Sequence, residues 1–392
     1  MPIATEIIRD ASRFAALRAE WNALLQQSDA DCVFLTWEWL HTWVRHLLGG
    51  RRLAILAVRR DNELIALAPF AVRAPQFKRL VPYPAFEFLG SGTAGSDYLD
   101  IIVRRGDEWA GLSALREEIR RAGIPVELGQ LPCERSQAAR LAAVLAQEGW
   151  HGQAESVHVC PFIDLSGHTW ESYLATLGAD HRYNFNRRLK NLHRRFDVRF
   201  EAACAETQRA EALRLLVALH EMRWRDRGEP SDAFHTPGHI AFHEEFTRLA
   251  LELGWLRLFV LRLDGVPVSA LYGFRYGRTL SFYQSGFDPG YGRYSVGLVT
   301  MGLAIRKAIE EGAGEYDLLH GAEAYKWHWA REARALERRE LFPAGARGAL
   351  WARVSRLARG TRRMARRVLP EGLAERLAAP AAVGTTTRSY VA

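Results

Sequence analysis

Apolar residues recur at helical and strand spacing in two successive stretches of this 392-residue chain. In the first stretch, the spacing predicts helices over residues 17–25, 37–48, 107–122 and 138–148, and strands over 53–58, 64–70, 86–89, 98–103 and 126–129. Asp61-Asn62 separates the first two strands with residues typical of a turn, so these strands should form a hairpin.

The second stretch follows the same order of elements. It predicts helices over 170–176, 181–196, 209–225, 242–253 and 295–311, and strands over 197–200, 255–263, 266–276, 279–287 and 316–320. Asp264-Gly265 is a strong signal for a two-residue hairpin. Both stretches thus begin with helices and continue through a hairpin, further strands, a helix and a late strand. This order favours duplication of one α/β module.

Length and composition fit a globular protein of two domains and a tail. The chain is 48% hydrophobic and 25% charged, which is ordinary for a soluble globular protein. Its length corresponds to two domains of about 100–200 residues each. We place the domains at residues 1–155 and 156–345, and the tail at 346–392.

The net charge of +8 comes from the region around the tail. Residues 334–367 contain eleven Arg, no Lys and two Glu, a charge of +9 that leaves −1 for the remainder. Apolar residues from Leu350 to Val368 recur at near-helical spacing, so this segment is predicted to form a basic amphipathic helix that can lie on an anionic membrane. Gly360 weakens such a helix, and a disordered basic tail is the alternative. Residues 380–392 are expected to be disordered.

The lack of a targeting signal and the spacing of the cysteines indicate a reducing compartment. No apolar run approaches the roughly 20 residues of a membrane span, and the amino terminus has no signal-peptide pattern. We therefore expect a cytoplasmic protein whose basic tail can contact the inner face of the membrane. Cys32, Cys133, Cys160 and Cys204 form no Cys-x-x-Cys pair, so we expect buried free thiols and no zinc site.

Two short motifs lack the context that their usual function needs. Gly90-Ser-Gly-Thr-Ala-Gly95 matches a dinucleotide-binding loop, but a strand pattern rather than a helix follows it, so a loop is predicted. His239 and His243 have the spacing of a metal pair without the glutamate of the metalloprotease motif, so a surface helix is the preferred interpretation. No metal is expected.

The richest chemistry lies between Asp317 and Trp329. This short segment follows an apolar strand and contains a histidine, a carboxylate, a phenol, an ammonium and two indoles. A second aromatic strand, Ser281 to Pro289, precedes it and is joined to it by a predicted helix. Strand, helix and then a strand with polar residues at its end is the geometry of a ligand-binding crossover.

Two arginine-rich helices are candidate binding elements. In the helix over 181–195, planar guanidinium groups such as Arg182 and Arg188 suit phosphate or carboxylate groups, although a solvated helix face is the simpler alternative. Nucleic acid is the less favoured partner, because a pure RNA-binding module would not need the surrounding strands. In the helix over 209–225, Arg223 and Trp224 either line a pocket or anchor the core.

Several motifs together resemble a known family. Gly265-Val-Pro-Val-Ser, the segment Phe282 to Pro289, Ser295-Val-Gly297 and the run Tyr316 to Trp329 look like the signature of the bacterial BioF2-like or CelD-like acetyltransferases. That family belongs to the GNAT superfamily and is related to the Fem peptidoglycan aminoacyltransferases. The resemblance implies an α+β fold with a mixed sheet, arranged as tandem GNAT-like (Fem-like) modules, the first of them degenerate, with a basic helical tail. In such modules the central strands splay apart and an acyl donor lies between them.

Two departures from the family pattern concern the donor. Ser295-Val-Gly297 stands where many relatives have Ser-Pro-Gly, and the usual GNAT pyrophosphate loop is absent. The pattern therefore predicts acyl transfer more firmly than it predicts acetyl-CoA as the donor.

The resemblance and the needs of acyl transfer assign roles to individual residues. Lys326 would stabilise the oxyanion or hold a donor phosphate, by similarity to the Fem lysine. Glu323 is the candidate base and His320 the alternative, with Tyr325 or Tyr283 as the acid. The remaining assignments are donor binding by Tyr283, Ser285, Ser295, Val296 and Gly297, and substrate binding by Arg182, Arg188, Arg223, Trp224 and Gln284.

The expected function is N-acylation of an amine on a small molecule or amino sugar, from acetyl-CoA or another acyl-CoA. The resemblance connects this reaction with exopolysaccharide or cell-envelope synthesis. A Fem-type transferase that uses aminoacyl-tRNA is one alternative. An inactive acyltransferase that acts as a scaffold on a membrane surface is the other.

Overall fold

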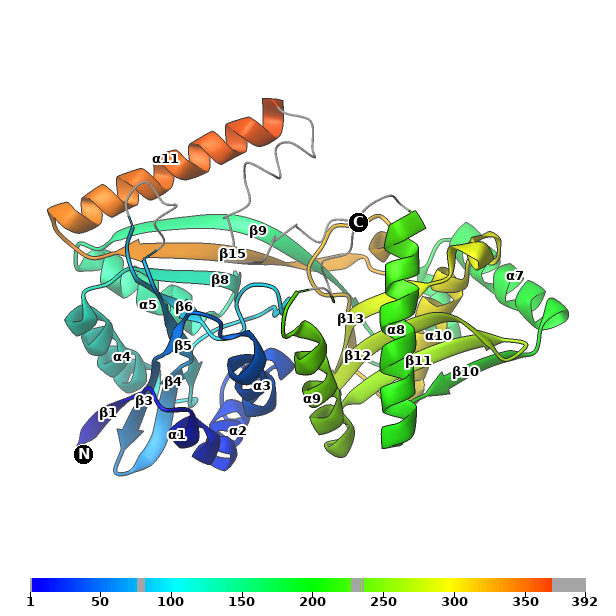
Figure 1. Cartoon of the computed structure of the whole chain (residues 1–392), viewed down its shortest axis with the longest axis horizontal. Coiled ribbons are helices and arrows are strands. Elements are labelled where there is room, and N and C mark those ends of the chain that lie inside the picture. The colour runs from blue at the N-terminus through cyan, green and yellow to red at the C-terminus, as the bar shows by residue number, and fades with distance from the viewer. Residues whose placement is uncertain (1, 76–81, 227–233, 235, 369–392) are drawn as a thin grey trace. The chain divides into compact units, whose positions relative to one another are not determined.

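The computed structural model describes residues 2–75, 82–226, 234 and 236–368, which divide into two compact units (Figure 1). Unit 1 consists of the residues up to His158, Thr236–Phe242 and the described residues from Ala335 onward. Unit 2 consists of the described residues of Val159–His235 and of His243–Arg334. Unit 1 thus includes a late segment that the sequence-based boundaries assign to the second domain and the tail.

Unit 1 contains two groups of strands. The first group has the order β1-β3-β4-β7, and the second has the order β15-β8-β6-β5-β2. Their bounds are β1 Ile3–Ile8, β2 Arg52–Leu53, β3 Ile55–Arg60, β4 Glu63–Ala68, β5 Phe70–Arg73, β6 Ala85–Phe88, β7 Ile102–Val103, β8 Val126–Pro132 and β15 Glu332–Phe342. The predicted hairpin at Asp61-Asn62 is confirmed, since Arg60 pairs with Glu63 and both turn residues have positive φ.

The helices of unit 1 are α1 Ala11–Ala16, α2 Arg18–Gln26, α3 Trp37–Leu47, α4 Glu108–Ala122, α5 Gln137–Gln147 and α11 Ala346–Val368, with the 3-10 helix η1 at Val33–Leu35. Helices α2, α3, α4 and α5 begin and end close to their predicted positions, whereas α1 was not predicted. Helix α4 packs closely on the sheet at Gly111, where an added Cβ would lie 2.9 Å from the Cβ of Ala66. The G-x-G-x-x-G segment is a loop, as predicted.

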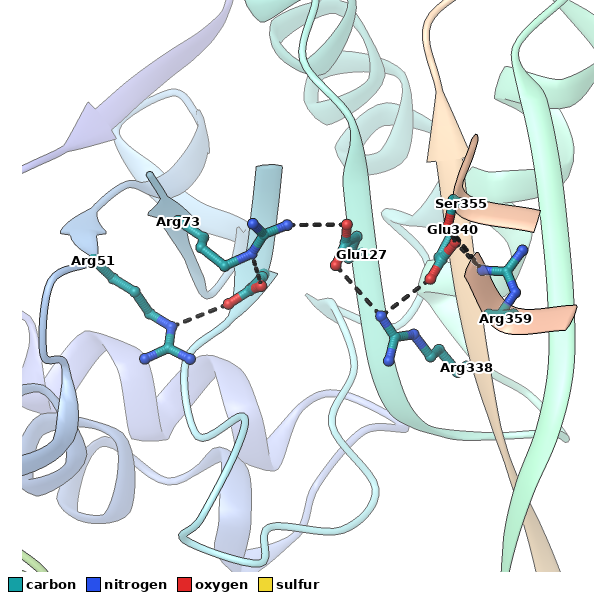
Figure 2. Close-up of polar contacts among 8 residues, drawn as sticks. Arg51, Arg73, Glu127, Arg338, Glu340, Ser355 and Arg359 are labelled. Carbon is teal, nitrogen blue, oxygen red and sulfur yellow. Dashed lines mark hydrogen bonds and ion pairs between the residues drawn. The ribbon is translucent and has the colours of Figure 1, made fainter. Parts of the chain in front are cut away.

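A row of carboxylates crosses the second strand group of unit 1 (Figure 2). Glu87 on β6 pairs in register with Glu127 on β8, which pairs in turn with Glu340 on β15. Like charges directly opposite each other destabilise a sheet, so such a row needs cations between its members. Arg73 bridges Glu87 and Glu127, with 3.0 Å between its Nη2 and Glu127 Oε1. Arg338 bridges Glu127 and Glu340 at 3.4 and 3.0 Å.

Unit 2 is built on the strand order β10-β11-β12-β13-β14-β9. The strands are β9 His151–Asp164, β10 Val198–Ala202, β11 Leu256–Leu263, β12 Val266–Tyr276, β13 Thr279–Phe287 and β14 Glu315–Asp317. The Asp264-Gly265 hairpin is confirmed by the pairing of Leu263 with Val266. Strands β9 and β15 each begin in one unit and end in the other.

Helices cover both faces of the unit 2 sheet (Figure 1). Helix α8 packs on β11, β12 and β13 from one side, and α10 packs on the same strands from the other side together with α6 and α7. The helical elements are α6 Trp170–Thr176, α7 Ala179–Arg195, α8 Glu206–Asp226, α9 His239–Glu252 and α10 Val296–Glu310, with 3-10 helices η2 Pro289–Tyr294 and η3 Lys326–His328. On the α10 side, Phe185 and Trp329 approach Gly302 so closely that an added Cβ would lie 2.2 and 2.8 Å from them.

Several sequence expectations are corrected by the structure. The strand predicted over 98–103 is reduced to Ile102–Val103, and the strand predicted over 316–320 ends at Asp317. Strands β1, β9 and β15 were not predicted. Strands β9 and β15 are rich in polar residues, so the alternating burial that β9 shows in the structure is not visible as an apolar pattern. Cys160 is buried, but Cys133 and Cys204 are exposed rather than buried. His239 and His243 are both buried, not on a surface helix.

The tail is helical over Ala346–Val368, as one of the two predictions for it stated. The predicted disorder of residues 380–392 lies outside the described residues. No helix in the described part of the chain is long and apolar enough to cross a membrane.

Candidate active site

The two central strands of unit 2 part after three residue pairs. Strands β13 and β14 are parallel and pair only from Thr279 and Glu315 to Ser281 and Asp317. Strand β13 continues to Phe287 and stays paired with β12 on its other edge. Within the described residues, the edge of β13 that faces β14 therefore has no strand partner beyond Ser281. Backbone polar groups on such an edge can bind a ligand that enters between the strands.

A β-bulge at Tyr283 lies at the start of this unpaired edge. Phe282 pairs with Gly273 on β12 and Gln284 pairs with Tyr272, so Tyr283 is the extra residue. Gly273 makes room for it, because an added Cβ there would lie 2.3 Å from the carbonyl oxygen of Ser281. The bulge re-aims the residues that follow it, as bulges beside active sites do.

The opposite side of the opening begins where β14 ends. The carboxylate of Asp317 accepts a hydrogen bond from the Leu319 backbone N–H at 2.8 Å. Leu319 has a φ of 55° and Gly321 a φ of 119°, so the chain turns sharply away from the sheet here. A positive φ is costly at a leucine, and the surrounding contacts must hold it in place.

Lys326 provides those contacts. Its side chain is 3% exposed, and its ammonium donates to the carbonyl oxygens of Leu319 at 3.2 Å and His320 at 2.6 Å. The third contact of the ammonium is an ion pair with Glu323 Oε2 at 3.0 Å. The ammonium thus donates two of its three protons to carbonyl oxygens, and it interacts with Glu323 through charge, since Glu323 Oε2 accepts no hydrogen bond from the described residues. Lys326 thus holds the turn after β14 closed.

Glu323 lies against the glycine of the same turn. An added Cβ at Gly321 would lie 2.3 Å from Glu323 Oε2, so a side chain there would displace this carboxylate, and the φ of 119° itself favours glycine. His320 and Tyr325 are half-buried, and Tyr325 packs against the hydrophobic core of unit 2. The structure therefore places His320, Glu323, Tyr325 and Lys326 in one compact turn beside the opening.

The amino end of α10 presents unopposed backbone donors. The first three N–H groups of a helix have no partner within it, and the Ser295 side chain makes no capping hydrogen bond. The first turn has no acidic residue, and Gly297 packs beside Phe287. Helix α4 of unit 1 differs, because Glu108 in its first turn accepts the Gly106 N–H at 3.0 Å. The amino end of α10 therefore suits an anion such as a phosphate.

Helix α8 covers β13 at very close range. An added Cβ at Gly286 would lie 2.4 Å from the backbone nitrogen of His220, so the helix and strand touch through their main chains. His220 is buried, and its Nδ1 lies 3.1 Å from the Ser285 carbonyl oxygen. This contact holds the carbonyl group of Ser285, a predicted donor-binding residue, in one orientation.

An aromatic group lines the same side of the sheet. Tyr283 stacks edge-on to His243 and Tyr272, at centroid distances of 5.4 and 5.3 Å. Burial raises the pKa of Tyr272 well above its usual value. His220, His243, Tyr272, Gly273 and Gly286 were not predicted as site residues. The aromatic strand that contains Tyr272 was visible in the sequence, but its register against β13 was not.

The predicted substrate-binding residues are divided between the two faces of unit 2. Arg223 and Trp224 are half-buried on α8, where the Arg223 guanidinium lies over the Phe287 ring at 5.2 Å. Arg182 is exposed and Arg188 half-buried on α7, which packs with α10 on the other face. The structure therefore does not gather these residues into one cluster.

Helix α7 is nevertheless connected to the turn that contains Lys326. His181 Nε2 lies 3.1 Å from His328 Nδ1. Burial lowers the pKa of His328, and the charges of His181 and Arg188 lower it further. Arg188, unlike Arg182, thus acts electrostatically on the edge of the candidate site. Among the described residues, no group of three His, Cys, Asp or Glu side chains is arranged to hold a metal ion.

Comparison with known proteins agrees with this geometry. Residues 179–327 match the family model described as Acetyltransferase (GNAT) domain. This range covers β10 to β14 and ends at the turn that contains Lys326. No curated protein sequence matches the chain.

Solved structures share the fold over most of the chain. The crystal structure of FemX is 12% identical with a TM-score of 0.60, and the match covers 86% of this chain and 97% of FemX. The C-terminal domain of a protein assigned as a lysylphosphatidylglycerol synthetase in Agrobacterium fabrum is 13% identical, with a TM-score of 0.52 and coverage of 88% and 96%. L-PGS from Bacillus licheniformis is 12% identical, with a TM-score of 0.51 and coverage of 88% and 97%. At such identities the likeness shows the fold, which is GNAT-like.

Proposed function

We propose, from a GNAT-like fold with a GNAT domain match in unit 2, that the chain transfers an acyl group from an acyl-CoA to an amine. The parting of β13 and β14, with a bulge at Tyr283, is the observation on which this proposal rests. A thioester inserted between the strands would meet backbone donors on the unpaired edge of β13. Donors fixed before the reaction stabilise a developing oxyanion most effectively.

The residues around α10 fit the donor. The pyrophosphate of CoA would bind the N–H groups of Val296 and Gly297, where no acidic side chain of the first turn opposes it. Ser295 has a φ of 55°, which orients the chain as it enters the helix. Tyr283, Gln284 and Ser285 would flank the pantetheine and the acyl group.

The chemistry needs a base, an acid and an oxyanion site. The amine nitrogen attacks the thioester carbonyl carbon, a C–N bond forms, and the C–S bond then breaks. The amine proton passes to Glu323 or His320, and the departing thiolate takes a proton from Tyr325 or Tyr283. Because Lys326 donates to two carbonyl oxygens and pairs with Glu323, we assign it the positioning of this turn and assign the oxyanion to the β13 backbone.

The acceptor is proposed to be an amine of a small molecule or amino sugar, and the resemblance connects it with envelope or exopolysaccharide synthesis. Arg223 and Trp224 on α8 would bind anionic and apolar parts of it. The half-buried Arg188 on α7 would act at the other edge of the turn.

A donor-binding experiment tests the proposal. Acetyl-CoA and longer acyl-CoAs are titrated into the full chain, and thermal unfolding is recorded. A donor at 100 times its dissociation constant should stabilise the protein by about 2.7 kcal/mol. Gly297→Asp places a carboxylate in the first turn of α10 and should weaken binding at least about tenfold. Thr207→Asp is the matched control, since Thr207 is exposed at the same position of α8.

Transfer itself is followed by thiol release and by mass gain on a panel of amines. Binding that Gly297→Asp leaves unchanged would contradict the proposed phosphate site. If the chain binds no acyl-CoA but hydrolyses aminoacyl-tRNA or transfers its aminoacyl group, the Fem-type alternative replaces the proposal. A chain that binds neither donor would leave only the scaffold alternative.

A further inference from the structure

Helix α11 combines a strong positive charge with a fixed attachment to unit 1. Its sequence, residues 346–368, contains eight arginines and no lysine or acidic residue. The like charges of these arginines repel one another, so the side chains are stable either in solvent or beside an anionic partner. The arginines that already form ion pairs within unit 1 are neutralised, and only the remaining arginines can bind an anionic partner.

One face of α11 is engaged with unit 1. Trp351 and Ala352 are buried, and the Trp351 ring packs on Tyr83 at 5.5 Å. Ser355 donates to Glu340 at 2.7 Å, and Arg359 forms an ion pair with the same carboxylate (Figure 2). Glu340 ends the row of carboxylates that crosses the sheet. This face therefore holds the helix in a set orientation, with Arg359 neutralised.

The opposite face is exposed and has an unusual composition. Leu350 is 51% exposed and Leu357 is 68% exposed, and seven residues apart they lie on the same side of the helix. Arg353 and Arg356 lie between the two leucines in the sequence, to one side of them on the helix, and are exposed with no ion-pair partner among the described residues. Exposed leucines beside arginines without ion-pair partners differ from an ordinary solvated helix face.

We propose that this outer face of α11 binds the surface of an anionic phospholipid bilayer, with the helix axis parallel to the membrane. The arginines would contact lipid phosphates, and the two leucines would enter the boundary between headgroups and acyl chains. Nucleic acid would use the same charges but has no use for the leucines. It prefers exposed aromatic rings for stacking, and the one aromatic residue of α11, Trp351, is buried.

Vesicle co-sedimentation of the full chain tests this proposal. Vesicles of phosphatidylcholine alone are compared with vesicles that also contain phosphatidylglycerol, at low and at high salt. We expect binding to the anionic vesicles only, weakened by salt. Arg353→Gln with Arg356→Gln should reduce binding about 25-fold, since each arginine near an anionic surface contributes about fivefold. Leu350→Glu with Leu357→Glu should abolish it.

Two control variants separate the outer face from general effects. Arg9→Gln with Arg140→Gln removes the same charge from exposed positions elsewhere in unit 1 and should bind like the unchanged chain. Trp109→Glu removes an exposed aromatic residue from α4 and should also have no effect. Deletion of α11 is avoided because Trp351 is part of the packing of unit 1, and circular dichroism checks that every variant is folded.

The following outcomes would overturn the proposal. The unchanged chain could fail to bind anionic vesicles, or the outer-face variants could bind as well as the controls do. Transfer RNA is added as a competitor. If it displaces the vesicles and binds the leucine variants as well as the unchanged chain, the outer face binds nucleic acid instead. The assay measures binding alone, so its result is independent of whether the chain transfers an acyl group.

Discussion

At the scale of single residues, Lys326 shows how far a side chain's role depends on its partners. The sequence presents an ammonium beside a glycine, a carboxylate and aromatic residues, a pattern that fits oxyanion stabilisation. In the structure the ammonium is buried, donates to two carbonyl oxygens and forms an ion pair with Glu323. A lysine used in this way stabilises the turn first, and affects the reaction through the turn.

Lys326→Met should therefore lower the free energy of unfolding by about 3 kcal/mol, because it leaves the Glu323 carboxylate without its cation in a buried site. Urea unfolding measures the loss, with Lys190→Met on the exposed side of α7 as control. The double variant Lys326→Met/Glu323→Gln should lose less than the sum of the two single changes. If Lys326→Met leaves the free energy of unfolding unchanged, the positioning role is contradicted and the predicted catalytic role of Lys326 is favoured.

At the scale of elements, the site depends on how closely α8 lies on β13. The approach is possible because position 286 has no side chain, and it brings His220 to the carbonyl of Ser285. The bulge at Tyr283 depends similarly on Gly273. Two glycines on adjacent strands thus set the backbone geometry of the unpaired edge.

Gly286→Ala should destabilise the protein by about 3 kcal/mol, since the new methyl group would overlap main-chain atoms that cannot rotate away. Gly152→Ala on β9 is the matched control, because its Cβ would meet only Leu341 Cδ2 at 3.5 Å. The control should be neutral or stabilising by about 0.5 kcal/mol. Both are read from chemical unfolding, and equal stability of the two variants would contradict the described contact between α8 and β13.

At the scale of the whole molecule, the two units repeat one arrangement with different polar groups. In unit 1, β6 and β8 are parallel and pair only at Phe86 with Val126 and at Glu87 with Glu127. Arg73 then bridges the two glutamates, and Glu108 occupies the first turn of α4. In unit 2, the corresponding strands β13 and β14 part after Ser281 and Asp317, and the first turn of α10 has no acidic residue.

One acyl-CoA should therefore bind per chain, in unit 2. Isothermal titration calorimetry gives the stoichiometry, and Gly297→Asp should weaken this single site. A second site that Gly297→Asp does not affect would contradict the inference that the charges of unit 1 exclude the donor.

The sequence by itself determined the elements whose cause is local. Apolar stripes at helical spacing predicted α4, α5 and α10 to within a few residues, and the two-residue turns at Asp61-Asn62 and Asp264-Gly265 predicted both hairpins. The motifs around Gly321 and Lys326 identified the segment that borders the opening. These features depend on residues close together in the chain, and such interactions are readable from a pattern.

Only the tertiary structure decided where strands stop pairing and which charges meet. The end of β14 at Asp317, the bulge at Tyr283 and the bridging of Glu87 and Glu127 by Arg73 all depend on register between distant segments. Register is set by contacts of many residues at once, and a shift by one residue would exchange the faces of a strand. The same reason explains why Lys326 could be found in the sequence, while its partners could not.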